Sequence, residues 1–216
     1  MIPPCRNNVD EEEIHELCPK INTMPEVVVA LTGASGARYC VRLVEALVEH
    51  EWTVNLIVTS AGAINLDLEC GITPSDLAAR EGVTLEDNTN LAARAASGSA
   101  RFEAYVVCPA SGTTMGKIAA GISDNLATRS ALVAMKERRK LVIVPREAPY
   151  STPHLKAMYN LSKWGAVILP ASPGFYHSPG KIEDLIDFVV SRILDQLDIE
   201  HTLGKRWTGE EISVED

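Results

Sequence analysis

The stretch from Val27 to Tyr39 constrains the fold more than any other part of the chain. An apolar run, Val27 to Leu31, is followed by small residues and then by apolar residues at helical spacing. This order predicts a buried parallel strand, a tight turn and an amphipathic helix. In the turn, Gly33 and Gly36 allow close backbone approach, and Ser35 is expected to cap the helix. The start of such a helix suits a phosphate group, because it presents unpaired N–H groups.

Two familiar phosphate-binding motifs are excluded at this turn. The G-x-G-x-x-G spacing of dinucleotide-binding proteins is missing, and no Gly-Lys-Ser/Thr follows as in a Walker loop. A second interpretation is that the glycines only let a helix pack tightly on a strand. The turn by itself leaves both interpretations open.

Apolar strands and periodic helices alternate along most of the remaining chain. Strands are expected at 26–32, 54–58, 83–85, 104–108, 141–144 and 166–169. Helices are expected at 35–50, 61–69, 74–80, 152–163 and 181–198, with one more that runs through 118–120 and another that begins near 123. This alternation predicts an α/β fold with a doubly wound parallel sheet between two helix layers. We expect one domain over 25–200, preceded by an arm (1–24) and followed by a tail (201–216).

Composition narrows the class of protein further. Hydrophobic residues make up 46% of the chain but aromatic residues only 5%, which indicates an aliphatic core. The net charge of −9 argues against a nucleic-acid partner or an anionic membrane surface. No apolar run reaches membrane-spanning length, and the N-terminus is acidic rather than signal-like.

The cysteines and histidines indicate neither disulfides nor a metal site. The five cysteines lie far apart without a C-x-x-C pair, and they are Cys5, Cys18, Cys40, Cys70 and Cys108. This pattern is typical of reduced thiols in a cytoplasmic protein. The five histidines lack metal-ligand spacing, so no metal is expected.

Polar residues follow three of the expected strands. Thr59-Ser60 follows the second strand, Ser111 to Thr114 follows a later one, and Arg146-Glu147 follows the next. In an open parallel sheet the carboxyl ends of the strands form the ligand-binding edge. If no ligand binds there, the hydroxyls only cap helices, and Arg146 and Glu147 form a surface ion pair that contributes little to stability. Alternatively, Arg146 binds a phosphate and Glu147 exchanges protons.

Four further residues and one loop are candidates for a site. Arg129 and Lys136 are seven residues apart and share a helix face, although a basic helix end is usually only solvated. Prolines and a glycine rigidify the loop that carries Tyr176, and Arg192 borders the apolar stripe of the last helix. The polar segment 87–103 is either a flexible surface loop or a loop whose small residues admit a flat ligand.

Five motifs together resemble those of the UbiX-type flavin prenyltransferases. They are Gly33-Ala-Ser-Gly36, Ala96-Ser-Gly-Ser99, Met135 to Arg139, Pro145-Arg-Glu-Ala-Pro149 and Pro173-Gly-Phe-Tyr-His177. The resemblance covers residues 26–207 and implies a flavodoxin-like, Rossmann-related fold in a homo-oligomer, commonly a dodecamer, with sites between subunits. It also implies transfer of a dimethylallyl group from dimethylallyl phosphate or diphosphate to reduced FMN. The prenylated FMN then serves UbiD-type decarboxylases, and no metal is needed.

The resemblance also assigns roles to individual residues. The implied FMN contacts are Gly33, Ala34, Ser35, Thr59, Ser111, Gly112, Thr113, Thr114 and Arg146. The implied donor-binding residues are Arg129, Lys136, Tyr176 and Arg192. Glu147, Ser35 and Lys136 form the implied catalytic set, in which Glu147 transfers protons.

Two positions depart from the family pattern. Leu91 stands where the family often has an aromatic residue, and leucine offers no π face to an allylic cation. Ala110 stands where a cysteine is frequent.

Two other functions fit parts of the sequence. An FMN-dependent decarboxylase of cysteine derivatives shares the first glycine turn, but it requires a catalytic histidine and a Pro-x-Met-Asn motif where this chain has Pro109-Ala-Ser-Gly-Thr. A non-catalytic flavin carrier would need no second phosphate site.

Overall fold

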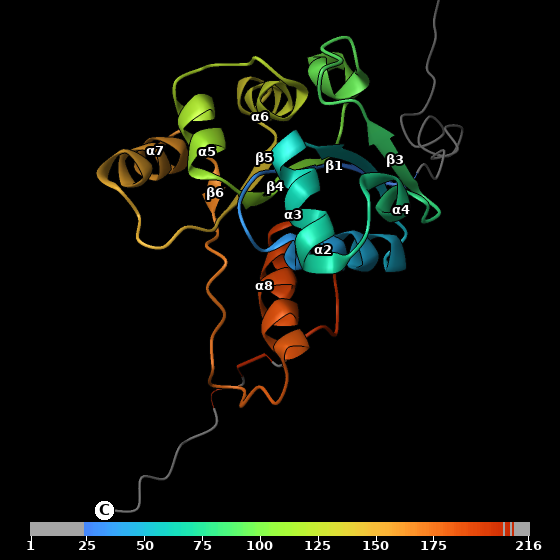
Figure 1. The fold of residues 1–216 in the computed structure, drawn as a ribbon, viewed down its shortest axis with the longest axis vertical. Helices are drawn as coiled ribbons and strands as arrows, with labels where there is room; N and C mark the ends of the chain where they lie inside the picture. The colour runs from blue at the N-terminus through green and yellow to red at the C-terminus, as the bar shows by residue number, and fades with distance from the viewer. Residues whose placement is uncertain (1–23, 205, 208, 210–216) are drawn as a thin grey trace, which may run out of the picture.

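A sheet of six parallel strands forms the centre of the protein, as seen in a computed structural model that describes residues 24–204, 206, 207 and 209 (Figure 1). The strand order is β3-β2-β1-β4-β5-β6. The strands are β1 (Glu26–Leu31), β2 (Thr53–Val58), β3 (Val83–Glu86), β4 (Ala104–Ala110), β5 (Lys140–Pro145) and β6 (Val167–Ile168).

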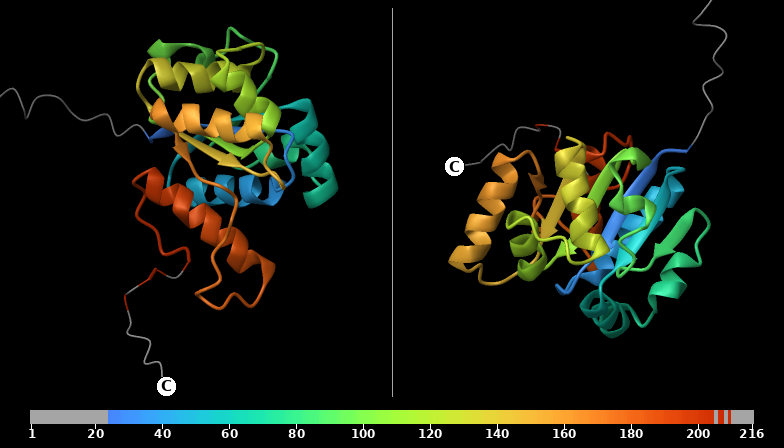
Figure 2. Two further views of the ribbon diagram at one scale, coloured as in Figure 1. Left: turned by 90° about the vertical axis from the view of Figure 1, so that its left-hand side faces the viewer. Right: turned by 90° about the horizontal axis from the view of Figure 1, so that it is seen from above.

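Helices cover both faces of the sheet (Figure 2). They are α2 (Ala37–Glu49), α3 (Ser60–Cys70), α4 (Pro74–Ala78), α5 (Gly112–Ala119), α6 (Leu126–Lys136), α7 (Thr152–Lys163) and α8 (Ile182–Gln196). Helices α2 and α8 share one core with Val27, Val29 and Leu31 of β1. Helices α5, α6 and α7 share the other core with Val28 and Ala30. Both faces of β1 are therefore buried, which explains its continuous apolar run and confirms the predicted three-layer fold.

The strand order places a switch point between β1 and β4. The chain moves outward from β1 to β2 and β3, returns to β4 on the other side of β1, and continues to β5 and β6. This is the Rossmann order, in which ligands bind beyond the carboxyl ends of the strands where the winding reverses. The turns that follow β1 and β4 border this position.

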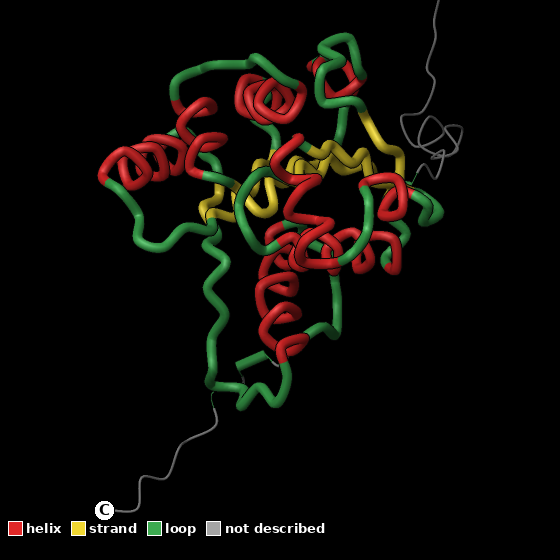
Figure 3. Tube along the Cα trace, in the orientation of Figure 1, coloured by secondary structure: helices red, strands yellow, loops and turns green. Residues whose placement is uncertain are grey.

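The segment 170–181 connects β6 to α8 and runs away from the sheet as a long loop (Figure 3). The first turns of α8 extend away from the sheet with it. Two ion pairs tie this part of α8 to α2, Arg38 to Glu183 at 2.9 Å and Arg42 to Asp187 at 2.8 Å. The first turns of α8 therefore lie beyond the sheet, whereas Val190, Ile193 and Leu194 pack in the core with it.

The structure refines several expected boundaries. The helix expected from residue 123 begins at Leu126, because the Asn125 side chain accepts a hydrogen bond from the Thr128 amide at 2.9 Å and caps it there. The loop expected at 87–103 contains two short 3₁₀ turns, η1 (Arg94–Ala96) and η2 (Gly98–Ala100).

The expected N-terminal arm, up to residue 23, and most of the tail lie outside the described residues. None of the helices in the described part of the chain is both long and apolar enough to cross a membrane.

Candidate functional site

Thr32, which directly follows β1, joins the two turns at the switch point. It is fully buried, and its hydroxyl donates to the Pro109 carbonyl at 2.8 Å. The same oxygen accepts from the Ser111 amide at 2.9 Å. The turn after β1 is thus fastened to the end of β4 and to the turn that follows it by two hydrogen bonds through one side chain. Sequence reasoning did not select Thr32, although its position at a strand's carboxyl end was a usable signal.

The expectation that Ser35 caps α2 is wrong. Gly36 occupies the cap position with a left-handed φ of 111°, and no cap side chain accepts a hydrogen bond there. Glu69, at the end of α3, supplies the acceptor instead. Its carboxylate accepts from the Gly36 amide at 2.8 Å and from the Ala37 amide at 2.7 Å. An anion that belongs to the chain therefore already occupies the start of α2.

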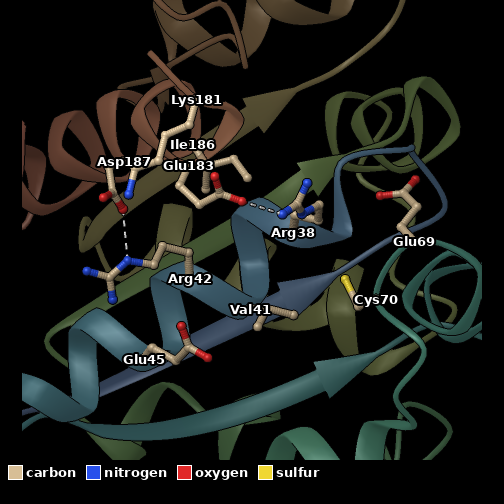
Figure 4. A pocket seen from close by; sticks show the side chains of 10 residues that line it. All are labelled: Arg38, Val41, Arg42, Glu45, Glu69, Cys70, Lys181, Glu183, Ile186 and Asp187. Atoms are coloured by element: carbon tan, nitrogen blue, oxygen red, sulfur yellow. Dashed lines mark hydrogen bonds and ion pairs between the residues drawn. The ribbon is translucent and has the colours of Figure 1, made fainter. Parts of the chain in front are cut away.

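Glu69 also borders a cleft of about 520 Å³ between α2 and α8 (Figure 4). Arg38 and Arg42 line this cleft together with their ion-pair partners on α8. Sequence reasoning missed Glu69, because 33 residues separate it from the amide it binds at Gly36.

The first glycine of the turn has a packing reason to be glycine. A Cβ added at Gly33 would lie 2.7 Å from the Cβ of Ala61 in α3. Gly33 therefore has a close-packing role, although the helix that it packs against is α3 and not α2, the helix that follows β1. This role does not conflict with ligand binding, because the Gly33 backbone is exposed at the carboxyl edge of the sheet.

The hydroxyl residues after β2 and β4 are helix caps. The Thr59 side chain accepts from the Gly62 amide at 3.1 Å and starts α3. The Ser111 hydroxyl accepts from the Thr114 amide at 3.2 Å and so caps the start of α5. It also lies 3.0 Å from the Thr114 hydroxyl. The amides of Gly112 and Thr113 in the first turn of α5 have no partner within the helix. They can receive a phosphate.

The imidazole of His154 lies against this turn. A Cβ added at Gly112 would lie 2.2 Å from its Nε2. His154 stands in the first turn of α7, and its Nδ1 accepts from the Ser151 amide at 3.4 Å. Only glycine at position 112 leaves room for the ring, so α7 packs tightly beside the start of α5. Sequence reasoning did not single out this histidine, since the contact joins two separate helices.

Arg146 links the end of β5 to the turn after β1. Its Nε donates to the Ser35 carbonyl at 2.9 Å. Burial raises the pKa of the neighbouring Tyr39 hydroxyl, Cys108 raises it further, and the Arg146 charge opposes both. No ion pair joins Arg146 to Glu147 among the described residues, so the surface-pair interpretation is wrong. The Glu147 carboxylate instead accepts from the Ala148 amide at 3.2 Å.

Tyr176 and Arg192 line a second cavity, of about 300 Å³, beside the second half of α8. The Tyr176 ring packs edge-on against three other rings, with centroid separations of 5.6 Å to His177, 5.8 Å to Phe188 and 5.6 Å to Trp207. The Arg192 guanidinium pairs with Asp195 at 2.5 Å. The structure therefore brings these two predicted donor-binding residues together.

Lys136 lies at the amino ends of the strands, whereas Arg146 lies at their carboxyl ends. It ends α6 just before β5, whereas Arg146 directly follows β5. A strand of this length rises by roughly 20 Å. Helix α6 also packs on the opposite face of the sheet from α8, which carries Arg192. Within one chain the four residues Lys136, Arg146, Tyr176 and Arg192 do not form one cluster.

Lys136 and Arg129 contact the segment that precedes β4. The Lys136 amino group pairs with Glu137 beside Gly98. The Nε of Arg129 donates to the Ala96 carbonyl at 3.1 Å. The small-residue loop is thus held against α6, and Leu91 near its start is half exposed.

The described cysteines are free thiols. Burial raises the pKa of the Cys40 thiol to about 12, and it raises that of Cys108 well above its usual value. Cys5 and Cys18 lie outside the described residues. In the described part of the chain, no three His, Cys, Asp or Glu side chains are placed to hold a metal ion together.

Comparison with known proteins agrees with this architecture. The fold and the edge of polar turns define an α/β flavoprotein, and residues 18–194 match the Flavoprotein family. The chain is 43% identical over 203 residues to the flavin prenyltransferase UbiX of Pseudomonas aeruginosa, covering 88% of this chain and 97% of that protein. The chain therefore belongs to the UbiX flavin prenyltransferase family.

Two solved structures extend the comparison. AnUbiX (PadA1), in complex with FMN and dimethylallyl pyrophosphate, superposes with a TM-score of 0.84 at 37% identity, covering 88% of this chain and all of that one. A dodecameric FMN-dependent UbiX-like decarboxylase from Escherichia coli O157:H7 superposes with a TM-score of 0.82 at 38% identity, covering 85% and 100%.

Proposed function

We propose that this protein transfers a dimethylallyl group from dimethylallyl phosphate or diphosphate to reduced FMN. The allylic C–O bond breaks, the phosphate leaves with its electron pair, and the five-carbon unit becomes bonded to the flavin as a fourth ring. The observation that carries this proposal is the link between Arg146 and the Ser35 carbonyl. It places a guanidinium at the switch point, between the turns expected to hold FMN.

The start of α5 is the better site for the FMN phosphate. Glu69 already binds the first amides of α2, so a second anion there would meet a carboxylate. The first turn of α5 has no such occupant, and the hydroxyls of Ser111 and Thr114 lie beside it. We assign the remaining flavin contacts to Gly33, Ala34, Ser35, Thr59, Gly112, Thr113 and Arg146.

Arg192 and Tyr176 are the proposed donor-binding residues of this chain. Breaking the allylic bond leaves negative charge on the departing phosphate, so a fixed cation and a phenol stabilise the transition state more than the ground state. The aromatic rings packed around Tyr176 restrict its movement. They also give the cavity an apolar wall that suits a hydrocarbon group.

A second copy of the chain supplies Lys136 and Arg129 in this proposal. Lys136 lies at the amino ends of the strands, and its helix packs on the opposite face of the sheet from the helix of Arg192. This supports a shared site, because Lys136 and Arg192 of one chain are too far apart to bind the same phosphate. Ile64 and Leu68 on α3 are 60% and 77% exposed and one helical turn apart, as expected for a surface that another subunit covers. The dodecameric relative supports the same assembly.

Glu147 is the proposed proton-transfer group. Ring closure removes a proton from the flavin ring system, and a carboxylate next to Arg146 at the sheet edge can accept it. The reaction needs no metal. Free buried thiols and an acidic surface suit the reducing cytoplasm, where a UbiD-type decarboxylase would receive the product.

An anaerobic assay tests the proposal. The protein is incubated with reduced FMN and dimethylallyl phosphate, and the flavin released by denaturation is weighed by mass spectrometry. We expect a flavin heavier by one C5H8 unit, together with free phosphate. Recovery of unchanged FMN with both dimethylallyl phosphate and dimethylallyl diphosphate would instead support a flavin carrier.

A further inference from the structure

Asp195 is the centre of a charged cluster that the proposed reaction has not used. Its Oδ2 pairs with Arg192 at 2.5 Å, and its Oδ1 pairs with Arg206 at 2.7 Å and with His201 at 3.1 Å. The Asp195 side chain is only 16% exposed. One carboxylate thus holds an arginine of α8 and an arginine of the following segment next to each other.

The hydrogen bonds to Asp195 occupy only some of the N–H donors of the two guanidinium groups. In the described part of the chain, Arg192 bonds through NH1 alone, whereas Arg206 bonds through NH2 alone. Each therefore keeps N–H donors for another acceptor. Both side chains are more than half exposed, and both line the 300 Å³ cavity with Tyr176.

The charge of this cavity favours an anion. Burial raises the pKa of the Asp195 carboxyl, but hydrogen bonding and charge from Arg206, with the charge of Arg192 and a hydrogen bond from His201, lower it below its usual value. Asp195 is therefore ionised at neutral pH. Two guanidinium groups against one carboxylate leave a net positive charge beside the apolar rings of Tyr176 and Trp207. A phosphate ester of a short hydrocarbon matches both features.

We propose that Arg206 binds the donor phosphate together with Arg192, and that Asp195 is a positioning residue that holds the two guanidinium groups in place. This inference rests on the proposed function. It adds Arg206, which follows α8, to the site. Two guanidinium forks offer more N–H donors to phosphate oxygens than one, and hydrogen bonds to charged groups are the stronger kind.

The test measures donor binding without turnover. Protein loaded with oxidised FMN, which cannot accept the prenyl group, is titrated with dimethylallyl phosphate by calorimetry. Arg206→Ala should raise the Kd for dimethylallyl phosphate by about tenfold or more, since it loses a charged hydrogen bond. Its FMN affinity should stay within about twofold of wild type. Arg206→Lys keeps the charge and should recover part of the lost affinity.

Arg80→Ala is the matched control, because Arg80 also pairs with one carboxylate, Glu45, at 2.8 Å. It should bind dimethylallyl phosphate like the wild type. The inference is overturned if Arg206→Ala also binds like the wild type, or if its loss is equalled by Arg80→Ala or by a loss of FMN affinity. If the wild type itself neither binds the donor nor prenylates reduced FMN, the proposed function fails instead.

Discussion

The hydroxyl of Thr32 accepts a hydrogen bond from the backbone amide of Ser111, with 2.9 Å between oxygen and nitrogen. The two residues are 79 positions apart, and each directly follows a central strand. The contact spans the switch point and fixes the distance between the turns that we assign to FMN. A side chain that is fully buried thus positions a site that it does not line.

Replacing Thr32 by valine should loosen this connection. The Ser111 amide and the Pro109 carbonyl would each lose a partner, so we expect the free energy of unfolding to fall by about 1–3 kcal/mol. FMN affinity should fall as well. Urea denaturation and FMN fluorescence titration measure the two effects. Thr32→Ser keeps the hydroxyl and should behave nearly like the wild type. Equal losses in both variants would mean that packing of the methyl group matters instead.

Arg146→Ala should weaken FMN binding. It removes the guanidinium that bonds the Ser35 carbonyl and faces the proposed flavin site, so about a tenfold or greater rise in the FMN Kd is expected. Arg101→Ala, at an exposed position before β4, is the control. Unchanged FMN affinity in Arg146→Ala would contradict the assignment.

Lys136→Ala and Arg192→Ala should each lower prenylation by about 10²–10³ while FMN stays bound. If sites are shared between subunits, co-expressing the two variants should restore part of the activity. Some sites then combine an intact Lys136 from one chain with an intact Arg192 from another. Anaerobic turnover of the mixed oligomer measures the recovery. A mixture no more active than the single variants would show that each chain uses its own pair.

Glu147→Gln keeps the shape of the side chain but removes the exchangeable carboxyl proton. Both ligands should bind normally, and turnover should stall with a partly alkylated flavin. Mass spectrometry of flavin released at early times tests this. Wild-type rates of ring closure in the glutamine variant would exclude Glu147 as the proton-transfer group.

Alkaline pH should destabilise the fold through its buried thiols. Burial raises the pKa of Cys40 to about 12 and raises that of Cys108 well above its usual value. Their stabilising effect is complete below the unfolded pKa of about 8.5 and falls by about 1.4 kcal/mol per thiol for each pH unit above it, until the folded pKa is reached. Urea denaturation between pH 7 and 10 should show this slope. Cys40→Ala/Cys108→Ala should flatten it.

The sequence alone was enough to predict the parallel sheet, both helix layers and the polar turns at the strand ends. These features depend on local patterns, since the run from Val27 to Leu31 is apolar on both faces and the following helix is amphipathic. The family resemblance rested on short motifs that contain Arg146, Glu147 and Tyr176. That the chain belongs to the UbiX family was therefore predictable before the fold was known.

Only the tertiary structure decided what holds these turns and which predicted residues meet. The cap of α2 comes from Glu69 rather than Ser35, because a carboxylate on a neighbouring helix reaches the free amides. Arg192 and Tyr176 share a cavity, whereas Lys136 lies across the sheet. Helical periodicity relates residues on one element and carries no information about how separate elements pack. The distances between these side chains follow from strand order and helix packing, which exist only in the folded chain.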